Sequence, residues 1–594
     1  MVKIFKSKLF IPLLLLVIGF AYFSSFGRYV ILFQNDEHLF LFTFDYLKSF
    51  LNMPGGFSEW LSSFFTQFYY YPLLGAFVIS SLMLVVWLMS RYLFSYYGLI
   101  SDMGLSVIVY GSLFGVVQFY ENSLVSIVAV FINLGLLFLI LRLKNTFIRY
   151  ILEILAAVVL YVLTGAYFAT FIAVTAVSEL ILFNGIGRFV NLLTTLSLGI
   201  YIPYFFSIHF YYLFAPVAYK YPVVSDAYFH GYSFAVINVV LLLLLLLAKI
   251  GERYKTTVDK VFKYKGYSKA VLLTGLVLYV VYLYNPPVAE LVYFAQKGKS
   301  VGIENSSSLN SLKLWDEVLD LSERSSGTGS LYPYYTNIAL QNKGRLLDDM
   351  MNYYQNRGVK GLYYTWVGNS HMREHGGLFY YSIGYVNEAH HWAYESMIHT
   401  GPVAPILKQL AIYNIVLGKM PGAKKYLNVL KQTLFYRSWA DRFFALANDT
   451  VKLNSLEWVV NKRNQIPGGD FFVDEGSIKS NLENCVNANP ENKFAFDYLM
   501  AFYLLDGRPG KVLERLNLIR EFYEVIPKSV REAIVLLPDY PPEFEAEHSE
   551  LGKYVVARDK MLKSQFDKEK FDKLYSNRYW YYIDFLSPHH KLKK

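Results

Sequence analysis

The first half of the chain consists of long apolar runs separated by short polar loops. A helix needs about 20 mostly apolar residues to cross a bilayer. Nine runs approach this length, and each predicts a membrane-spanning helix. They are Leu9–Ser25, Pro72–Ser90, Met103–Phe119, Leu124–Leu141, Ile148–Leu163, Tyr167–Phe183, Phe189–Ile208, Tyr232–Ala248 and Ala270–Tyr284.

Two features of these runs affect the topology. Lys3, Lys6 and Lys8 precede the first run as in a signal peptide, but residues 26–31 contain no small-residue cleavage site, so we expect an uncleaved anchor. The fifth and sixth runs are joined at Thr164-Gly165-Ala166. They therefore form either one hairpin of two spans or one broken helix. Which of the two is present decides on which side of the membrane the later loops and the second half of the chain lie.

The loop between the first two spans, residues 34–71, has a helical pattern of its own. Aromatic and aliphatic residues recur every three or four positions on both sides of the break Met53-Pro54-Gly55-Gly56. The pattern predicts two short amphipathic helices, which we expect to lie along the membrane surface. The residues that carry it are Phe40, Phe44, Leu47 and Leu51 before the break and Trp60, Phe64 and Phe68 after it.

In the second half, after Asn285, apolar residues alternate with charges at helical spacing. Three stretches predict pairs of antiparallel helices, each joined by a turn that contains glycine and a basic residue: 334–355, 407–434 and 494–521. These pairs resemble tetratricopeptide repeats, although their spacing is irregular. The resemblance implies stacked helical hairpins that share a core and provide a binding surface.

Composition and charge agree with a membrane protein. Hydrophobic residues are 54% of the chain and charged residues 17%. The formal net charge of +10 does not indicate nucleic-acid binding, because much of the excess lies in loops on one side of the predicted spans. The positive-inside rule places that side, and the N-terminus, in the cytoplasm. Nine crossings then place residues 286–594 outside. A single cysteine, Cys485, permits no intrachain disulfide.

Asp36 and Glu37 are the first candidates for chemistry. They follow the first span directly, where carboxylates are costly to place near lipid, so they indicate a functional site. They are equally compatible with a hydrated pair that marks the membrane boundary. Glu153 and Glu179 lie near the cytoplasmic ends of the fifth and sixth runs, where we expect them to pair with Arg149 or Arg188.

At this point residues 3–284 resemble the GT-C superfamily of membrane glycosyltransferases. The resemblance rests on Asn35-Asp36-Glu37, on the Pro54-Gly55-Gly56 break and on Tyr70-Tyr71-Pro72 at the entry to the second span. It implies that Asp36 or Glu37 is the catalytic carboxylate, acting as a general base on an acceptor hydroxyl or helping to bind a divalent metal, Mg or Mn. It also implies a sugar donor carried on polyprenyl phosphate.

The resemblance further implies a site for the carrier phosphate near the outer loops. Lys220 is the only Lys or Arg between His209 and Gly231, and lysine offers a point charge to phosphate. We expect Lys220, His209 and His230 to bind substrate, with His38 beside the acidic pair. An ordinary solvated loop is the alternative for each of them.

His371-Met372-Arg373-Glu374-His375 matches the H-x-x-E-H zinc motif, which works only on a helix. Glycines at 368 and at 376–377 flank the motif, so we expect a polar loop there instead. In that loop His371, Arg373, Glu374 and the nearby His390 would help to bind substrate.

The sequence thus predicts an all-α protein with two domains. Residues 1–285 form a polytopic bundle of about nine spans in the bacterial inner membrane, and residues 286–594 form an extracytoplasmic helical-repeat domain. The leading hypothesis is a GT-C-like glycosyltransferase that uses a lipid-linked sugar. The alternative is a membrane-anchored scaffold whose repeat domain binds an envelope protein.

Overall fold

The regular structure in the described part of the chain is entirely helical, as expected. The computed structural model describes residues 10–96, 102–117, 124–143, 145–182, 187–222, 291–292, 294–295, 309–324, 329–365, 370–468, 473–474 and 476–588. The chain divides into two compact units. The first contains Met1–Asn285 and Gln432–Phe435, and the second contains Pro286–Lys431 and Tyr436–Lys594.

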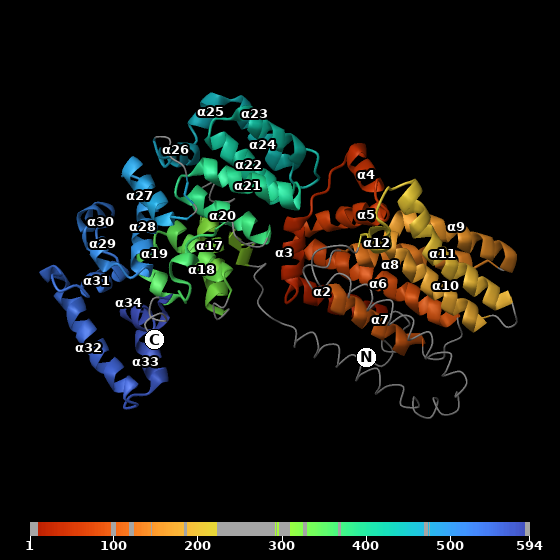
Figure 1. The fold of residues 1–594 in the computed structure, drawn as a ribbon, viewed down its shortest axis with the longest axis horizontal. Coiled ribbons are helices and arrows are strands. Elements are labelled where there is room, and N and C mark those ends of the chain that lie inside the picture. Colours follow the sequence, from red (N-terminus) through yellow and green to blue (C-terminus); the bar gives the residue numbers. More distant parts are fainter. Residues whose placement is uncertain are drawn as a thin grey trace. The chain divides into compact units, whose positions relative to one another are not determined.

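The first unit is a bundle of apolar helices (Figure 1). Helix α6 is central to it, because α2, α7 and α8 all pack against α6. The elements are α2 (Phe10–Ser24), α3 (Arg28–Glu37), α4 (Phe44–Leu51), α5 (Gly56–Thr66), η1 (Gln67–Tyr70), α6 (Pro72–Tyr96), α7 (Asp102–Val117), α8 (Val125–Leu141), α9 (Thr146–Thr164), η2 (Gly165–Phe168), α10 (Ala169–Leu182), α11 (Gly187–His209) and α12 (Ala215–Lys220).

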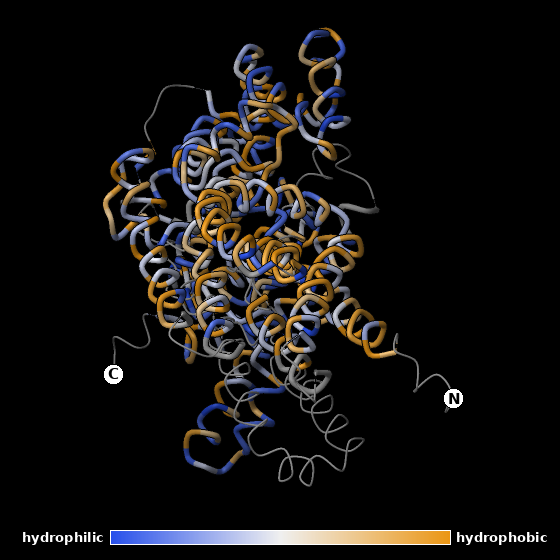
Figure 2. The backbone as a smooth tube through the Cα atoms, turned by 90° about the vertical axis from the view of Figure 1, so that its right-hand side faces the viewer, coloured by the Kyte–Doolittle hydropathy of each residue, from blue (hydrophilic) through white to orange (hydrophobic). Residues whose placement is uncertain are grey.

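The expected count of nine spans is not confirmed. Among the described residues, three helices are long and apolar enough to cross a membrane: Pro72–Tyr96, Phe147–Glu179 and Phe189–His209. A fourth results if α2 and α3, which meet at a bend of 68°, form one span. Figure 2 shows apolar residues along these helices. Helices α7 and α8 are shorter, with 16 and 17 residues. The predicted runs 232–248 and 270–284 lie outside the described residues.

The apolar stretch Phe147–Glu179 folds back on itself. The Arg149 Nε lies 3.5 Å from Glu153 Oε1 near the start of α9, and both side chains interact electrostatically with Glu179 near the end of α10. A straight helix would separate Glu153 from Glu179 by about 39 Å. This proximity favours the hairpin for the predicted fifth and sixth runs, with η2 as its turn, although residues 147–179 count as a single candidate span. The expected pairing with Arg149 is confirmed.

The turn of this hairpin makes a close backbone contact with two other loops, which we call the glycine junction. The Gly55 N–H donates to the Val162 carbonyl at 3.0 Å, and the Ala166 N–H donates to the Tyr221 carbonyl at 2.8 Å. A Cβ atom on Gly165 would lie 2.5 Å from the Tyr221 carbonyl oxygen, so the contact requires glycine there. The junction therefore fixes where α5 begins and where α12 ends.

The two short helices predicted in the first loop are confirmed as α4 and α5. The Thr43 hydroxyl caps α4 by accepting from the Tyr46 N–H at 3.2 Å, and Gly55, with φ of +81°, precedes α5. Helix α5 packs against α8 and α9. The face of α5 that is buried is polar, with Ser58, Ser62, Ser63 and Thr66, whereas its aromatic residues pack on the preceding segment.

The second unit consists of successive helices packed as hairpins, with α20 on α21, α21 on α22, α22 on α23 and α23 on α24. Its elements are α17 (Leu309–Arg324), α18 (Leu331–Asn342), α19 (Leu346–Asp349), η3 (Met350–Asn352), η4 (Gly358–Gly361), α20 (Ser370–Ser382), α21 (Val386–Thr400), α22 (Ala404–Val416), α23 (Met420–Leu430), α24 (Arg437–Asn448), α25 (Thr450–Asn454), α26 (Glu457–Asn464), α27 (Ile478–Ala488), α28 (Lys493–Leu505), α29 (Pro509–Leu513), α30 (Leu516–Phe522), α31 (Lys528–Ile534), η5 (Pro542–Phe544), α32 (Glu545–Leu562), α33 (Lys568–Tyr575), α34 (Tyr579–Tyr581) and η6 (Tyr582–Leu586).

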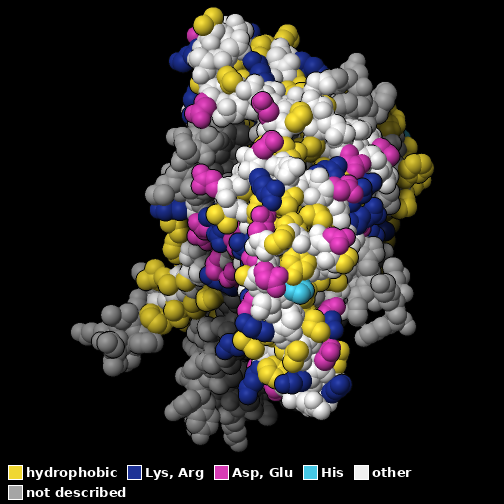
Figure 3. Space-filling model, turned by 90° about the vertical axis from the view of Figure 1, so that its left-hand side faces the viewer, with side chains coloured by type: hydrophobic (Ala, Val, Ile, Leu, Met, Phe, Trp, Pro, Cys, Tyr) yellow, Lys and Arg dark blue, Asp and Glu magenta, His cyan; other side chains and the backbone are white. Residues whose placement is uncertain are grey.

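The three predicted hairpins are present, and their turns share one geometry. Gly344, Gly418 and Gly507 have positive φ angles of 68°, 73° and 68°. In each turn the N–H of the following basic residue donates to a carbonyl five residues earlier, as in a Schellman motif. Two of the predicted return helices differ from the prediction: 346–355 is the short helix α19 followed by η3, and 511–521 is divided into α29 and α30. Figure 3 shows acidic and basic side chains interspersed on the face that it draws, which is typical of a hydrated surface.

We expect Gly165→Ala to lower the thermal unfolding midpoint of the purified protein. The φ of Gly165 is +57°, and the new methyl group would overlap the Tyr221 carbonyl. The free energy of unfolding should therefore fall by about 1–3 kcal/mol. Gly552→Ala in α32 is the matched control. A Cβ there meets nothing within 4 Å, and alanine should raise the midpoint slightly. An unchanged midpoint in Gly165→Ala would contradict the role assigned to the junction.

Candidate active site at the end of α3

Asp36 and Glu37 lie in the last turn of α3, and both are half-buried. The Asn35 side-chain amide donates to Asp36 Oδ1 at 3.1 Å. The C-terminal end of a helix carries a partial negative charge, so carboxylates there are disfavoured by the helix dipole. The helix dipole therefore does not explain why two acids lie at this position.

His38 ends α3 in an extended conformation, with φ of −123° and ψ of 141°. Burial disfavours its charged form and lowers the pKa of His38 to about 4. The imidazole is therefore neutral at physiological pH. It can donate or accept a hydrogen bond beside the two carboxylates, but it does not supply the positive charge that a phosphate would favour.

The segment that follows His38 is held on α4 and α5. The Tyr46 hydroxyl donates to the Leu39 carbonyl at 2.5 Å. The ring of Phe40 is buried, and its centroid lies 5.5 Å from those of Tyr46 and Trp60 and 5.4 Å from that of Phe64. The aromatic residues of the predicted amphipathic helices thus fix the backbone immediately after the acidic pair.

A third carboxylate, that of Glu59, interacts with Tyr46. Glu59, in the first turn of α5, accepts a hydrogen bond from the Tyr221 hydroxyl at 2.8 Å and interacts electrostatically with Tyr46 and Tyr167. We call Glu59, Tyr46, Tyr167 and Tyr221 the Glu59–tyrosine cluster. Burial raises the pKa of Glu59 to about 7, and the hydrogen bond from Tyr221 opposes that rise. Glu59 therefore exchanges a proton near neutral pH.

Burial also raises the pKa of Tyr46 to about 12. Ser63, one helical turn after Glu59, hydrogen-bonds the Tyr46 hydroxyl and lowers that pKa, while the charge on Glu59 raises it. The protonation of Glu59 is thus linked to the hydroxyl that holds the Leu39 carbonyl. This linkage connects the cluster to the backbone two residues after Glu37.

The Glu59–tyrosine cluster was missed from sequence. One signal was present: Glu59 is the only acid between Asp45 and Asp102. Its partners Tyr167 and Tyr221 are more than 100 residues away, and no local pattern marks them among 52 tyrosines. The glycine junction and the packing of α5 on α8 and α9 bring them close in the fold.

The other residues expected to bind substrate are not gathered at this cluster. Lys220 is the last residue of α12 and is exposed, and the structure brings its neighbour Tyr221 to Glu59 instead. His209 ends α11, is exposed, and has its ring 4.7 Å from that of Phe205. His230 lies outside the described residues.

The expectation of a polar loop at the H-x-x-E-H motif is wrong, because the whole motif lies in α20. A Cβ on Gly376 would lie 2.2 Å from the Trp392 ring, so this glycine allows α20 to pack on α21 rather than ending the helix. His375 is buried, and its Nδ1 hydrogen-bonds the Tyr335 hydroxyl at 2.7 Å. The side chains of His371, Arg373 and Glu374 lie outside the described residues.

His390, the fourth residue expected to act with that motif, lies in α21. Burial lowers the pKa of His390, and its ring stacks on that of Tyr394 at 6.5 Å. Its neighbour His391 lies 3.5 Å from Glu388, which also accepts a hydrogen bond from the Trp392 indole. All these contacts lie within α21.

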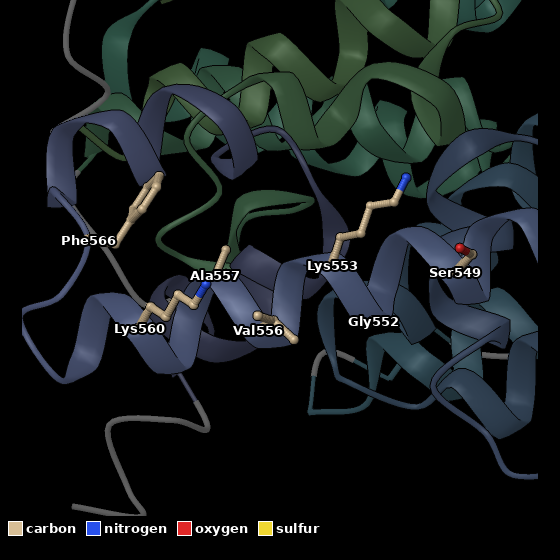
Figure 4. Close-up of a pocket in the computed structure, with 7 residues that line it drawn as sticks. All are labelled: Ser549, Gly552, Lys553, Val556, Ala557, Lys560 and Phe566. Atoms are coloured by element: carbon tan, nitrogen blue, oxygen red, sulfur yellow. The ribbon is translucent and has the colours of Figure 1, made fainter.

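A pocket of about 520 Å³ lies along α32 in the second unit (Figure 4). Its lining contains two lysines and no acid, and Lys553 pairs with Glu550 at 2.6 Å. None of the residues expected to carry chemistry lines it. The lining residues are Ser549, Gly552, Lys553, Val556, Ala557, Lys560 and Phe566.

Comparison with known proteins places the chain in a family without giving it an activity. A family model described as "Family of unknown function (DUF6057)" matches residues 3–586, nearly the whole chain. No curated protein and no solved structure matches the chain significantly.

The pKa of Glu59 leads to a prediction that infrared spectroscopy can check. The protonated carboxyl of Glu59 should give a carbonyl band that disappears with a midpoint near pH 7 and is absent from Glu59→Gln. Tyr221→Phe removes a hydrogen bond that favours the carboxylate, so its midpoint should move to higher pH. Asp45→Asn, in the same loop, should leave the band unchanged. A midpoint near the ordinary value of 4.5 would show that Glu59 is not buried as described.

Proposed function

We propose that this chain, which belongs to the DUF6057 family, is a membrane glycosyltransferase of the GT-C type. It would move a sugar from a polyprenyl-phosphate carrier to an acceptor glycan, lipid or protein on the outer face of the bacterial inner membrane. One observation carries the proposal: two half-buried carboxylates in the last turn of α3, at the C-terminal end of the helix pair α2–α3. The GT-C resemblance of residues 3–284 supplies the reaction class.

In the proposed reaction, Asp36 or Glu37 accepts the proton of an acceptor hydroxyl as general base. The acceptor oxygen forms a bond to the anomeric carbon of the sugar, and the bond from that carbon to the carrier phosphate oxygen breaks. Polyprenyl phosphate leaves with the electron pair. The proton on the carboxylate then passes to water, which returns the general base to its charged form.

The Glu59–tyrosine cluster has a positioning role in this proposal. Tyr46 ties the Leu39 carbonyl to α4, and Glu59 is linked to the same hydroxyl. Catalytic carboxylates need to be held to within about half an ångström of their working geometry. The cluster would hold the backbone that carries Glu37 and His38 without touching the substrate.

Exposed aromatic side chains of the first unit would contact the lipid carrier. Phe44 at the start of α4 is 76% exposed, and Tyr212, between α11 and α12, is 84% exposed. Aromatic residues favour the boundary between headgroups and acyl chains. In the proposed topology the N-terminus is cytoplasmic, and this boundary and the second unit face outward.

The divalent Mg or Mn that the resemblance left open is not supported by the donor set. Among the described residues, no group of three or more His, Cys, Asp or Glu side chains is placed to hold a metal ion. The proposed mechanism therefore assigns base and positioning roles to the protein's own residues and contains no metal-dependent step.

The second unit favours one other candidate function, a membrane-anchored scaffold. Its helices from α20 to α24 pack in sequence order, as in the repeat arrays that bind other proteins. In this alternative the second unit would hold a protein of the cell envelope, and the carboxylates of α3 would have no chemical role.

The carboxylates distinguish the two functions. In cells that carry Asp36→Asn with Glu37→Gln, we expect transfer to be lost, so that one envelope sugar disappears and its polyprenyl-linked donor accumulates. Asp45→Asn in α4 is the matched control and should leave both pools normal. Mass spectrometry of glycans and carrier lipids, at equal protein levels, measures the outcome. Normal glycans and carriers in the correctly inserted double variant would reject the glycosyltransferase and favour the scaffold.

A further inference from the structure

An apolar groove of about 330 Å³ lies between α8 and α9 in the first unit. All the residues that line it have aliphatic side chains. They form two stripes at helical spacing, one on each of the two helices, which pack against each other. Because this lining offers a ligand no polar side chain, a hydrocarbon chain is the chemistry that fits it. The lining residues are Leu136, Leu139, Ile140, Leu143, Leu152, Leu155, Ala156 and Val159.

Much of this groove is exposed at the surface of the first unit. The side chains of Leu139, Leu155 and Val159 are 58%, 55% and 49% exposed. Helix α9 belongs to the candidate span Phe147–Glu179. Exposed aliphatic residues on a helix that crosses a membrane face lipid chains, which are as apolar as leucine. The groove is therefore accessible from the hydrocarbon of the bilayer.

The length of the groove fits one leaflet of a bilayer. Leu136 and Leu143 are seven positions apart on α8, and so are Leu152 and Val159 on α9. At about 1.5 Å per residue each stripe is about 10.5 Å long, against about 15 Å for half of the hydrocarbon core. One acyl chain that enters from a single leaflet can therefore lie along the whole groove.

Basic residues lie at one end of the groove. Leu143, which lines this end, stands between Arg142 and Lys144 in the turn that joins α8 to α9, and residues 142–145 contain no acid. Arg142 is exposed, and its guanidinium carbon lies 4.2 Å from the ring centre of Phe138 and 5.9 Å from that of Tyr92. The described residues include no ion-pair partner for Arg142. A cation at the end of an apolar groove indicates an anionic headgroup on a hydrocarbon chain.

Phosphate is the headgroup chemistry that this arrangement favours. A guanidinium that lies over aromatic rings keeps its N–H groups in its own plane, where two of them can donate to the oxygens of one phosphate. Basic residues at the boundary of a bilayer also attract lipids that have a net negative charge. A phospholipid such as phosphatidylglycerol supplies the phosphate, the net charge and the acyl chain.

We propose that the groove between α8 and α9 holds one acyl chain of an anionic phospholipid whose phosphate binds to Arg142. The positive-inside rule assigns the turn at 142–145 to the cytoplasmic side, so this lipid comes from the cytoplasmic leaflet. The proposed sugar transfer takes place at the outer face and uses other residues. Binding of the phospholipid therefore does not depend on the glycosyltransferase reaction.

Native mass spectrometry of the full-length protein tests this. The protein is reconstituted in nanodiscs with equal amounts of phosphatidylcholine and phosphatidylglycerol and is then transferred to detergent. We expect one phosphatidylglycerol molecule to remain bound to each chain. Ala156→Phe places a ring in the groove and should abolish this retention. Leu193→Phe, at a 65% exposed position of the candidate span Phe189–His209, is the matched control and should leave the lipid bound.

Two further variants separate the lipid chain from the headgroup. Val159→Phe narrows the groove at an exposed position, so it should lower retention even if Ala156→Phe does not fold. Arg142→Gln leaves the lining intact and should lower the retention of phosphatidylglycerol about fivefold. Lys48→Gln, at an exposed position in α4, removes the same charge elsewhere in the first unit and should leave retention unchanged.

Four outcomes would overturn the proposal. These are the absence of bound phospholipid in the unmodified protein, full retention in both phenylalanine variants of the groove, full retention in Arg142→Gln, or polyprenyl phosphate in place of a phospholipid on protein purified from native membranes. The last outcome would assign the groove to the sugar carrier instead.

Discussion

The candidate active site depends on a backbone contact that leaves no room for side chains. Gly55, Gly165 and the Tyr221 carbonyl meet at the glycine junction, where the Gly55 and Ala166 amides donate to carbonyls of neighbouring segments. This contact fixes the start of α5 and the position of Tyr221, so it brings Glu59 and its tyrosines together. The buried Asn133 of α8 donates to the Thr164 hydroxyl and to the Tyr167 carbonyl, satisfying polar groups where α9 ends.

Asp36, Glu37 and Glu59 lie in settings that disfavour the charged form of a carboxyl group. Asp36 and Glu37 lie at the unfavourable end of α3, and Glu59 is buried enough to raise its pKa to about 7. Residues held in unfavourable electrostatic settings are concentrated at functional sites, because the same setting tunes their reactivity. Tyr46 interacts with Glu59 and also holds the Leu39 carbonyl, two residues after Glu37.

Sequence reasoning succeeded where the signal was local and failed where it was not. The break at Pro54-Gly55-Gly56 and the glycine turns of the second unit determine nearby backbone, so α4, α5 and the hairpins could be predicted. The partners of Glu59 could not, because Tyr167 and Tyr221 reach it only through the fold. The glycines that flank residues 371–375 indicated a polar loop, whereas Gly376 makes room for Trp392 between two packed helices.

The most direct test is to determine on which side of the membrane the loops of the first unit and the second unit lie. With buried Cys485 replaced, single cysteines at Phe44, Tyr212 and Val451, all strongly exposed, can be probed in intact cells with a maleimide that does not cross the membrane holding the protein. The account predicts labelling at all three positions from outside. Labelling only after the membrane is permeabilised would place the carboxylates and the second unit in the cytoplasm and contradict it.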